Sequence, residues 1–319
     1  MTRLPVYLLV FLCLQVVLAS VIYWQRSQQL DSHQTEPLLS FDRDKLDKIV
    51  IMGAEQTENA VLTKDEGIWL LANLDRLPVD QNQLDTALDK LSALTTNWPI
   101  ATTKASHQRF ELQQDNFQRR IQLFQEGKKV ADLLLGSSPG FRKVHLRMLD
   151  DDNVYALPLN TFDFPIKDQQ WLDKSLLAIS DVNSIQGPDY RLIKEQDAWI
   201  LKSPADKTVP LDQDKAVGLA RALSNLRVLE LASEPPVFAS PTIKTLMVKG
   251  EQQHNYQFLE FEDKYYVKKQ QITDKVFTLN QTDYQRITGV DLTGLMRSEP
   301  ETGAKAESTS KSVPPIEIE

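Results

Sequence analysis

The residues closest to a catalytic motif are Gly136-Ser137-Ser138-Pro139-Gly140, which match the Gly-x-Ser-x-Gly pattern of hydrolase nucleophile elbows. In that chemistry a strained turn between a strand and a helix holds the serine, Ser138 in this chain, above a sheet. The residues after Gly140 alternate between polar and apolar side chains and indicate another strand. A hairpin loop is therefore the favoured interpretation of residues 136–140.

An acidic run at residues 150–153, Asp-Asp-Asp-Asn, has oxygen atoms that suit a hard cation. It lacks the downstream glycine and glutamate of a calcium-binding loop and lies between two alternating segments, so we predict a solvated turn. The histidines show no i, i+4 pair and no nearby cysteine, which argues against a zinc site. They are His33, His107, His145 and His254.

Basic residues gather modestly on two predicted strand faces, where we expect them to balance neighbouring carboxylates. They are Arg142, Lys143 and Arg147 on one segment, and Lys268 and Lys269 on another. The sequence contains neither a glycine-rich phosphate loop nor a dinucleotide-binding fingerprint. We therefore predict no catalytic, cofactor-binding or metal-binding residues, no cofactor and no enzymatic activity.

The elements that would position these residues occur twice in the chain. Residues 78–94 and 210–226 align without gaps and share six of seventeen positions: Pro, Asp, Gln, Leu, Ser and Leu. Each stretch follows an apolar segment with a tryptophan, Trp69 or Trp199. Because a residue that only packs should recur in both copies, we predict that the two tryptophans are core residues. A functional residue can be confined to one copy.

In each copy, strand patterns and then a turn precede a helix with apolar residues at spacings of three and four. Asp80 and Asp212 stand at the N-cap positions, with Gln83 at the capping-box position of the first helix. After each helix the hydrophobic period changes to two, and short polar turns favour antiparallel hairpins. We predict an α+β fold: an N-terminal transmembrane helix, then two tandem pseudo-repeats, each an antiparallel sheet with one main packed helix.

The N-terminal residues give the clearest membrane signal. Residues 4–24 carry no charged side chain, and 21 helical residues span about 31 Å, close to the hydrocarbon thickness of a bilayer. Tyr7, Tyr23 and Trp24 lie near the ends of this segment, where aromatic rings favour the membrane interface. The apolar run continues beyond Ala19, a candidate signal-peptide cleavage site, so we predict an uncleaved anchor.

The composition of the whole chain, with 41% hydrophobic and 25% charged residues in 319, is typical of globular proteins. The net charge of −8 argues against a nucleic-acid partner, because phosphate binding needs a basic face. Arg3 and Arg26 nearly balance the positive charge on the two sides of the anchor. The signal-like N-terminus then favours a single-pass protein of the inner (cytoplasmic) membrane, with its C-terminal domain in the periplasm. Cys13, the only cysteine, fits either compartment.

These patterns divide the chain into five parts. Residues 1–24 form the anchor and residues 25–40 a polar tether. The first α+β repeat covers residues 41–175 and the second covers residues 176–297. Residues 298–319 are rich in Glu, Pro, Ser, Lys and Ala without apolar periodicity, which predicts a disordered tail.

The order of several short motifs between residues 45 and 290 resembles a bacterial family called domain of unknown function 4340. The matching residues are Trp69-Leu70, Pro78, Asp80, Gly136, Leu146-Arg147, Val154-Tyr155-Ala156-Leu157, Trp171-Leu172-Asp173-Lys174-Ser175-Leu176-Leu177, Trp199-Ile200-Leu201 and Leu211-Asp212. The resemblance implies a membrane-anchored envelope protein, often associated with ABC transporter components of the gliding-motility type. It implies no catalytic residues.

The leading hypothesis is a single-pass, membrane-anchored, extracytoplasmic binding or scaffolding protein. One partner would be the inner membrane, through residues 4–24. The other would be a membrane protein or a transporter, and in the transporter case this chain would be an accessory of an ABC-type transporter. Two alternatives stay open. One is an envelope serine hydrolase acting through the 136–140 loop, and the other is a small-ligand or lipid-binding domain at the repeat junction, residues 165–185.

Overall fold

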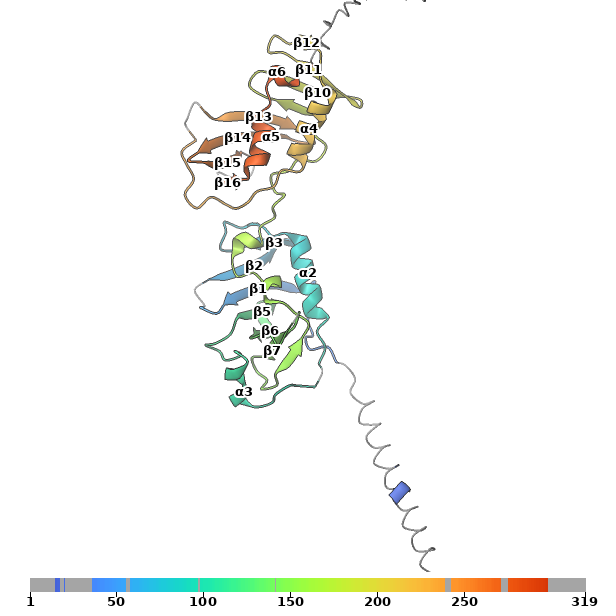
Figure 1. Ribbon diagram of the computed structural model, residues 1–319, viewed down its shortest axis with the longest axis vertical. Coiled ribbons are helices and arrows are strands. Elements are labelled where there is room, and N and C mark those ends of the chain that lie inside the picture. Colours follow the sequence, from blue (N-terminus) through green and yellow to red (C-terminus); the bar gives the residue numbers. More distant parts are fainter. Residues whose placement is uncertain are drawn as a thin grey trace, which may run out of the picture. The chain divides into compact units, whose positions relative to one another are not determined.

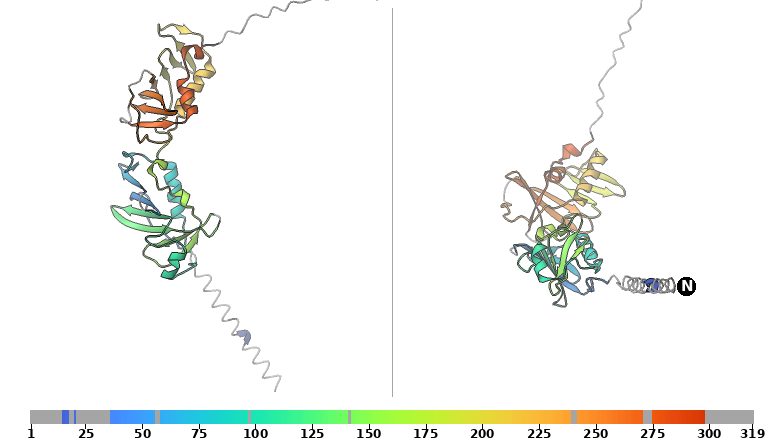
Figure 2. Two further views of the ribbon diagram at one scale, coloured as in Figure 1. Left: turned by 60° about the vertical axis from the view of Figure 1, so that its left-hand side comes forward. Right: turned by 60° about the horizontal axis from the view of Figure 1, so that its bottom comes forward.

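The computed structural model describes residues 15–17, 20, 36–55, 58–96, 98–140, 142–238, 242–270 and 275–297. The chain divides into two compact units, Met1–Asp173 and Lys174–Glu319. Each unit contains one antiparallel sheet of eight strands (Figures 1 and 2).

The first sheet has the strand order β4-β3-β2-β1-β5-β6-β7-β8. Its strands are β1 (Leu46–Gly53), β2 (Asn59–Asp65), β3 (Ile68–Leu71), β4 (Leu77–Pro78), β5 (Arg119–Gln125), β6 (Lys128–Leu135), β7 (Val144–Met148) and β8 (Tyr155–Leu157). β1 and β5 pair at the centre, although α2 (Gln81–Ser92) and α3 (Lys104–Arg109) separate them along the chain. Buried Ile51 lies opposite buried Ile121 in this pair, which places the core at the sheet centre.

The second sheet has the equivalent order β12-β11-β10-β9-β13-β14-β15-β16. Its strands are β9 (Ser184–Gln186), β10 (Arg191–Glu195), β11 (Ala198–Lys202), β12 (Thr208–Val209), β13 (Lys244–Lys249), β14 (Gln253–Phe261), β15 (Lys264–Lys269) and β16 (Val276–Leu279). Helix α4 (Gln213–Ser224) contacts β11, and α5 (Gln281–Thr288) contacts both β15 and α4. The short helix α6 (Leu292–Leu295) follows α5.

The predicted α+β fold class is wrong, because the described residues are mostly β, with two eight-stranded antiparallel sheets and few helices. The strands after each main helix continue the sheet that the strands before the helix begin, β5 beside β1 and β13 beside β9. The segment predicted as a turn before each main helix adds an edge strand, β4 or β12. One long helix per unit is therefore an addition to a large sheet.

The two main helices begin at the predicted aspartate caps. The Asp80 carboxylate accepts from the Gln83 N–H at 3.1 Å, and Asp212 accepts from the Asp214 N–H at 3.1 Å. The Asp80 N–H, which a capping-box glutamine would bind, donates to the Trp171 carbonyl at 2.8 Å. The buried apolar stripes are Leu84, Ala87, Leu88 and Leu91 in α2, and Ala216, Leu219 and Leu223 in α4.

In each unit, residues near the C-terminal end form the same contacts with the residues just before the main helix. Val79 forms a bridge with Leu172, and Leu211 forms one with Met296. The N-cap N–H donates to the Trp171 carbonyl in the first unit and to the Leu295 carbonyl in the second. Trp171 and Leu295 therefore hold equivalent positions.

Both repeated tryptophans are core residues, as predicted. Trp69 on β3 and Trp199 on β11 are each 5% exposed. Their recurrence in the sequence therefore reflects packing on equivalent strands.

Several predictions concern residues that the structure does not describe. They are the 298–319 tail, residues 25–35 of the tether and most of the 4–24 anchor. Among the residues that are described, no helix has the length and apolar character needed to cross a bilayer. Residues 36–38 pack on the first unit, where the Leu38 N–H donates to the Leu94 carbonyl at 2.8 Å and Pro37 forms a bridge with Thr95.

Candidate functional site

The predicted hairpin loop at residues 136–140 is confirmed. It connects β6 to its antiparallel neighbour β7. Ser138 Oγ lies 2.8 Å from the Gly140 carbonyl and 2.7 Å from the Lys143 carbonyl, so the hydroxyl is bound within the loop. A strand follows where a nucleophile elbow requires a helix, and Ser138 is not presented above a sheet.

The serine beside a histidine is Ser137, which the motif did not single out. Ser137 Oγ lies 3.0 Å from His145 Nδ1 and 3.2 Å from the Phe110 carbonyl. The Phe110 ring lies against the imidazole, with centroids 4.4 Å apart. Burial lowers the pKa of His145, and the positive charge of Arg109 lowers it further. His145 is only 7% exposed, so its imidazole lies in the interior of the first unit, beside the half-buried Ser137.

The acidic turn at residues 150–153 is held by the buried side chain of Arg147. The guanidinium donates at 2.9–3.1 Å to the carbonyls of Leu112, Met148, Leu149 and Asp151. The Asp151 carboxylate accepts both the N–H and the side-chain amide of Asn153 at 3.1 Å. Burial lowers the pKa of Arg147, against the opposing effect of the three nearby aspartates. The turn is thus part of the framework of the first unit.

Lys269 on β15 does not contribute to a basic surface, because it is buried. Its Nζ lies 5.5 Å from the ring centroid of Tyr256, and burial lowers its pKa. The Tyr256 hydroxyl donates to the Leu177 carbonyl at 2.6 Å. Desolvation lowers the pKa of His254, and the charge of Lys269 adds to this shift. This cluster belongs to the interior of the second unit.

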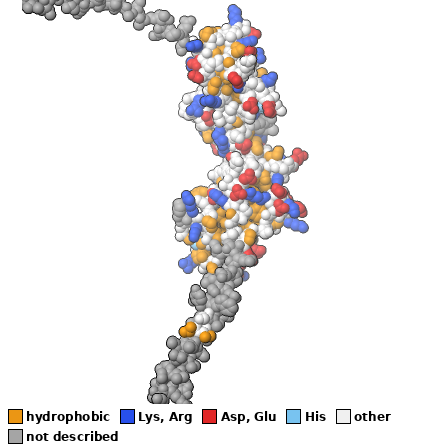
Figure 3. Space-filling view, turned by 90° about the vertical axis from the view of Figure 1, so that its right-hand side faces the viewer, with side chains coloured by type: hydrophobic (Ala, Val, Ile, Leu, Met, Phe, Trp, Pro, Cys, Tyr) orange, Lys and Arg blue, Asp and Glu red, His pale blue; other side chains and the backbone are white. Residues whose placement is uncertain are grey.

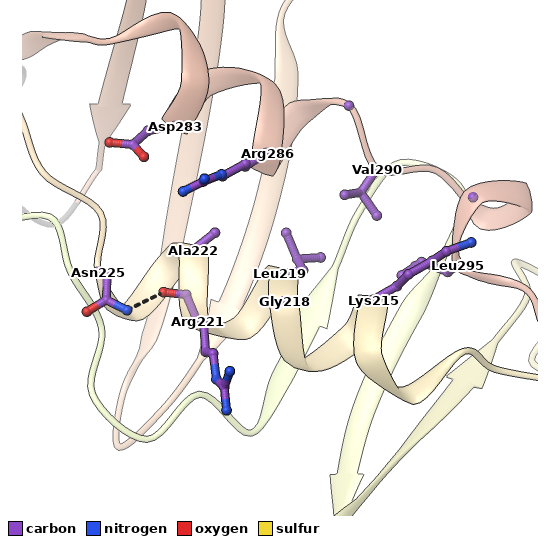
Figure 4. A pocket seen from close by; sticks show the side chains of 12 residues that line it. Lys215, Gly218, Leu219, Arg221, Ala222, Asn225, Asp283, Arg286, Val290 and Leu295 are labelled. Carbon is purple, nitrogen blue, oxygen red and sulfur yellow. Dashed lines mark hydrogen bonds between the residues drawn. The ribbon is translucent and has the colours of Figure 1, made fainter.

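A groove on the second unit, lined by residues of α4, α5 and the α6 region, has the geometry of a binding site (Figure 4). We call it the α4–α5–α6 groove. Its volume is about 490 Å³, which falls in the range of small-molecule sites. Leu219, Ala222, Val290 and Leu295 form an apolar floor. In Figure 4, Arg286 extends toward the Ala222 and Asn225 end, and Lys215 lies at the Leu295 end.

Gly218 lies in the middle of α4 and lines the groove. A Cβ added there would meet no described atom within 4 Å. Glycine in a helix interior costs about 0.8–1.0 kcal/mol relative to alanine. Neither packing nor backbone conformation requires glycine at this position, so its visible effect is to keep the groove open.

The equivalent place in the first unit carries larger side chains. The ungapped alignment pairs Gly218 with Thr86 and Ala222 with Lys90. The matching main-chain hydrogen bonds pair Leu295 with Trp171, which is fully buried. All three positions therefore lose side-chain volume in the second unit.

An ion pair also crosses this place in the first unit and has no counterpart in the second. Lys90 Nζ on α2 lies 2.7 Å from the Asp163 carboxylate. Asp163 stands three residues after the cap Asn160, as Asp283 stands three residues after the cap Asn280. Lys90 aligns with Ala222, so the second unit cannot form this ion pair, and no equivalent pair lies across the groove.

The groove is positively charged within an acidic protein. Lys215 and Arg286 against Asp283 give two cations minus one carboxylate, a balance of +1, whereas the whole chain carries −8; the Arg221 side chain extends away from α5 (Figure 4). Asn280 Nδ2 donates to the Asp283 carboxylate at 2.7 Å. Over the described segments, no ion pair within 4.0 Å joins Arg221 or Arg286 to a carboxylate. By contrast, acidic and basic side chains are interspersed over the face in Figure 3.

The sequence prediction missed this site although the alignment contained a signal for it. The six identities in residues 78–94 and 210–226 mark the shared framework. Two of the differences, Thr86 against Gly218 and Lys90 against Ala222, mark the groove. The third difference, Trp171 in the first unit and Leu295 in the second, lies outside the ungapped alignment. It is recognised only from the matching main-chain hydrogen bonds of the two units.

The fold defines a mostly β protein of two equivalent units, the second of which carries the α4–α5–α6 groove. The chain belongs to the family called domain of unknown function DUF4340, whose sequence model matches residues 69–243. The predicted resemblance to this family is confirmed. The match includes α4 and ends before α5 and α6. No curated protein and no solved structure matches the chain.

Proposed function

We propose that this chain is a membrane-anchored, extracytoplasmic binding or scaffolding protein that holds its ligand or partner in the α4–α5–α6 groove. One observation carries the proposal: Gly218, Ala222 and Leu295 replace the larger Thr86, Lys90 and Trp171 at equivalent positions. A duplicated framework needs the same packing twice, so a space kept in one copy alone favours a function specific to that copy.

Binding is favoured over catalysis by the chemistry of the groove. The twelve residues that line it include no serine, cysteine or histidine. Ser138, on which an envelope serine hydrolase would depend, is hydrogen-bonded within its own loop. A site with an apolar floor and a charged rim supplies affinity and orientation for a ligand.

The membrane part of the proposal rests on residues 4–24, which lack charged side chains over a length sufficient for a bilayer. A periplasmic C-terminal domain follows from the signal-like order of the N-terminus. Alkaline phosphatase fused after Glu319 should be active in intact cells, and a cytoplasmic reporter fused at the same place should be silent. The reverse pattern would refute the proposed location.

The partner class is supported by the family resemblance alone, which favours an accessory of an ABC-type transporter. Purification in a mild detergent should then recover a permease and an ATPase in fixed stoichiometry with this chain. Recovery of the chain by itself would count against a transporter partner and would leave the groove proposal standing.

Photo-crosslinking in intact cells tests the groove. Asn225 and Ala93 are both exposed and are the C-cap residues of α4 and α2, at equivalent positions of the alignment, so they form a matched pair. Asn225 lies at one end of the groove, where a larger side chain leaves the apolar floor uncovered. The photo-reactive amino acid p-benzoylphenylalanine in place of Asn225 should give a discrete adduct, and the same amino acid in place of Ala93 should not. The adduct should disappear when Leu295→Trp refills the groove. Equal adducts from both positions, or none from position 225, would refute the proposal.

A further inference from the structure

We propose that the α4–α5–α6 groove binds a single-chain anionic amphiphile, with its headgroup at Arg286 and its apolar chain over Leu219, Ala222 and Val290. This inference rests on the proposed function of the groove as a binding site. It specifies the chemistry of the ligand that the site takes.

The headgroup position follows from the distribution of charge along the groove. Arg286 extends toward the Ala222 and Asn225 end (Figure 4) and has no carboxylate within 4.0 Å in the described part of the chain. Lys215, at the other end, already lies 3.8 Å from the Asp212 carboxylate. A guanidinium presents parallel N–H donors that match the oxygens of a carboxylate or a phosphate. Arg286 is therefore the cation best placed to receive an anion.

The apolar part of the ligand follows from the floor. Between the two charged ends the groove presents Leu219, Ala222 and Val290. Gly218 adds no side chain, so a hydrocarbon chain can lie close to the backbone of α4. A peptide in extended form would bring N–H and C=O groups that these apolar side chains cannot satisfy. A helical peptide is about 10 Å across and would rest on the rim instead of filling the cavity.

Substitution of Asp283 tests whether the ligand is negatively charged. It lies three residues before Arg286 on α5 and lines the same groove. Its carboxylate, to which Asn280 donates, repels an anion bound at Arg286. Asp283→Asn should strengthen binding of an anionic amphiphile and Arg286→Gln should weaken it, whereas a ligand held by apolar contact alone would respond to neither.

The probes are hexanoate, octanoate, decanoate, octyl phosphate and octyltrimethylammonium, titrated calorimetrically into the full chain in lipid nanodiscs, with empty nanodiscs subtracted. The anions should bind and the cation should not. Affinity should rise about fourfold for each methylene that reaches the floor. Arg286→Gln should weaken octanoate binding about tenfold. A stronger octanoate signal identifies a free carboxylic acid as the natural source, and a stronger octyl phosphate signal identifies a lipid headgroup.

Gly218→Leu fills the groove and should abolish binding, whereas Thr86→Leu places the same side chain on α2 and should leave binding unchanged. Equal binding of the cation, or unchanged octanoate binding in Gly218→Leu, would overturn the proposal. If no anion binds but crosslinking at position 225 captures a protein, the ligand class is wrong and the proposed function stands. If both experiments fail, the groove is not a binding site.

Discussion

Replacing Gly218 by alanine is expected to stabilise the second unit. The residue lies inside the twelve-residue helix α4, where glycine costs about 0.8–1.0 kcal/mol relative to alanine. The added methyl group meets no described atom within 4 Å, so no steric cost offsets this gain. The free energy of unfolding should therefore rise by about 1 kcal/mol. For a unit of this size, residues 174–319, the melting temperature should rise by about 3 °C.

Hydrogen exchange of α4 peptides, followed by mass spectrometry in increasing urea, measures this change in the second unit alone. Peptides of α2 in the same sample provide the internal control, because the first unit is unaltered. A decrease in stability would show that Gly218 fills a packing or conformational need. The claim that Gly218 keeps the groove open at a cost in stability would then be refuted.

Three further substitutions test the framework. Gly136→Ala should destabilise the first unit by about 2 kcal/mol or more in urea unfolding, because its Cβ would lie 2.0 Å from a backbone oxygen. Arg147→Met should cost about 3 kcal/mol in the same assay, because one buried and two partly buried carbonyls, those of Leu112, Leu149 and Asp151, lose their donors. Burial alone would raise the pKa of Asp132, but hydrogen bonds from Arg120 and Lys129 hold it below its usual value. This pKa is lower in the folded than in the unfolded state, so its stabilisation is present above about pH 4 and lost as pH falls through the folded pKa. Asp132→Asn should flatten that part of the pH–stability curve.

Local features of the fold were predictable because their causes are local. Asp80 and Asp212 cap helices through contacts within three residues, and the spacing of the leucines fixes which face of each helix is buried. Trp69 and Trp199 were predictable as core because duplication exposes packing residues.

The sheet architecture was not predictable in the same way. Pairing of β1 with β5 joins segments separated by two helices, and no local pattern specifies that partnership. The class prediction failed because it gave the main helix of each repeat the same weight as its sheet, whereas each sheet has eight strands and few helices accompany it in the described residues. The groove was missed for a different reason: identities between the copies were used, whereas Gly218 and Ala222 are informative as differences.

Octanoate binding and unfolding free energy measured on one Gly218→Leu sample bear directly on the claim that the groove is a binding site. Leucine is among the strongest helix formers, so the variant should be more stable than the parent by about 0.8 kcal/mol. It should also fail to bind octanoate, because its side chain occupies the cavity. A variant that is more stable and binds octanoate as the parent does would contradict the account.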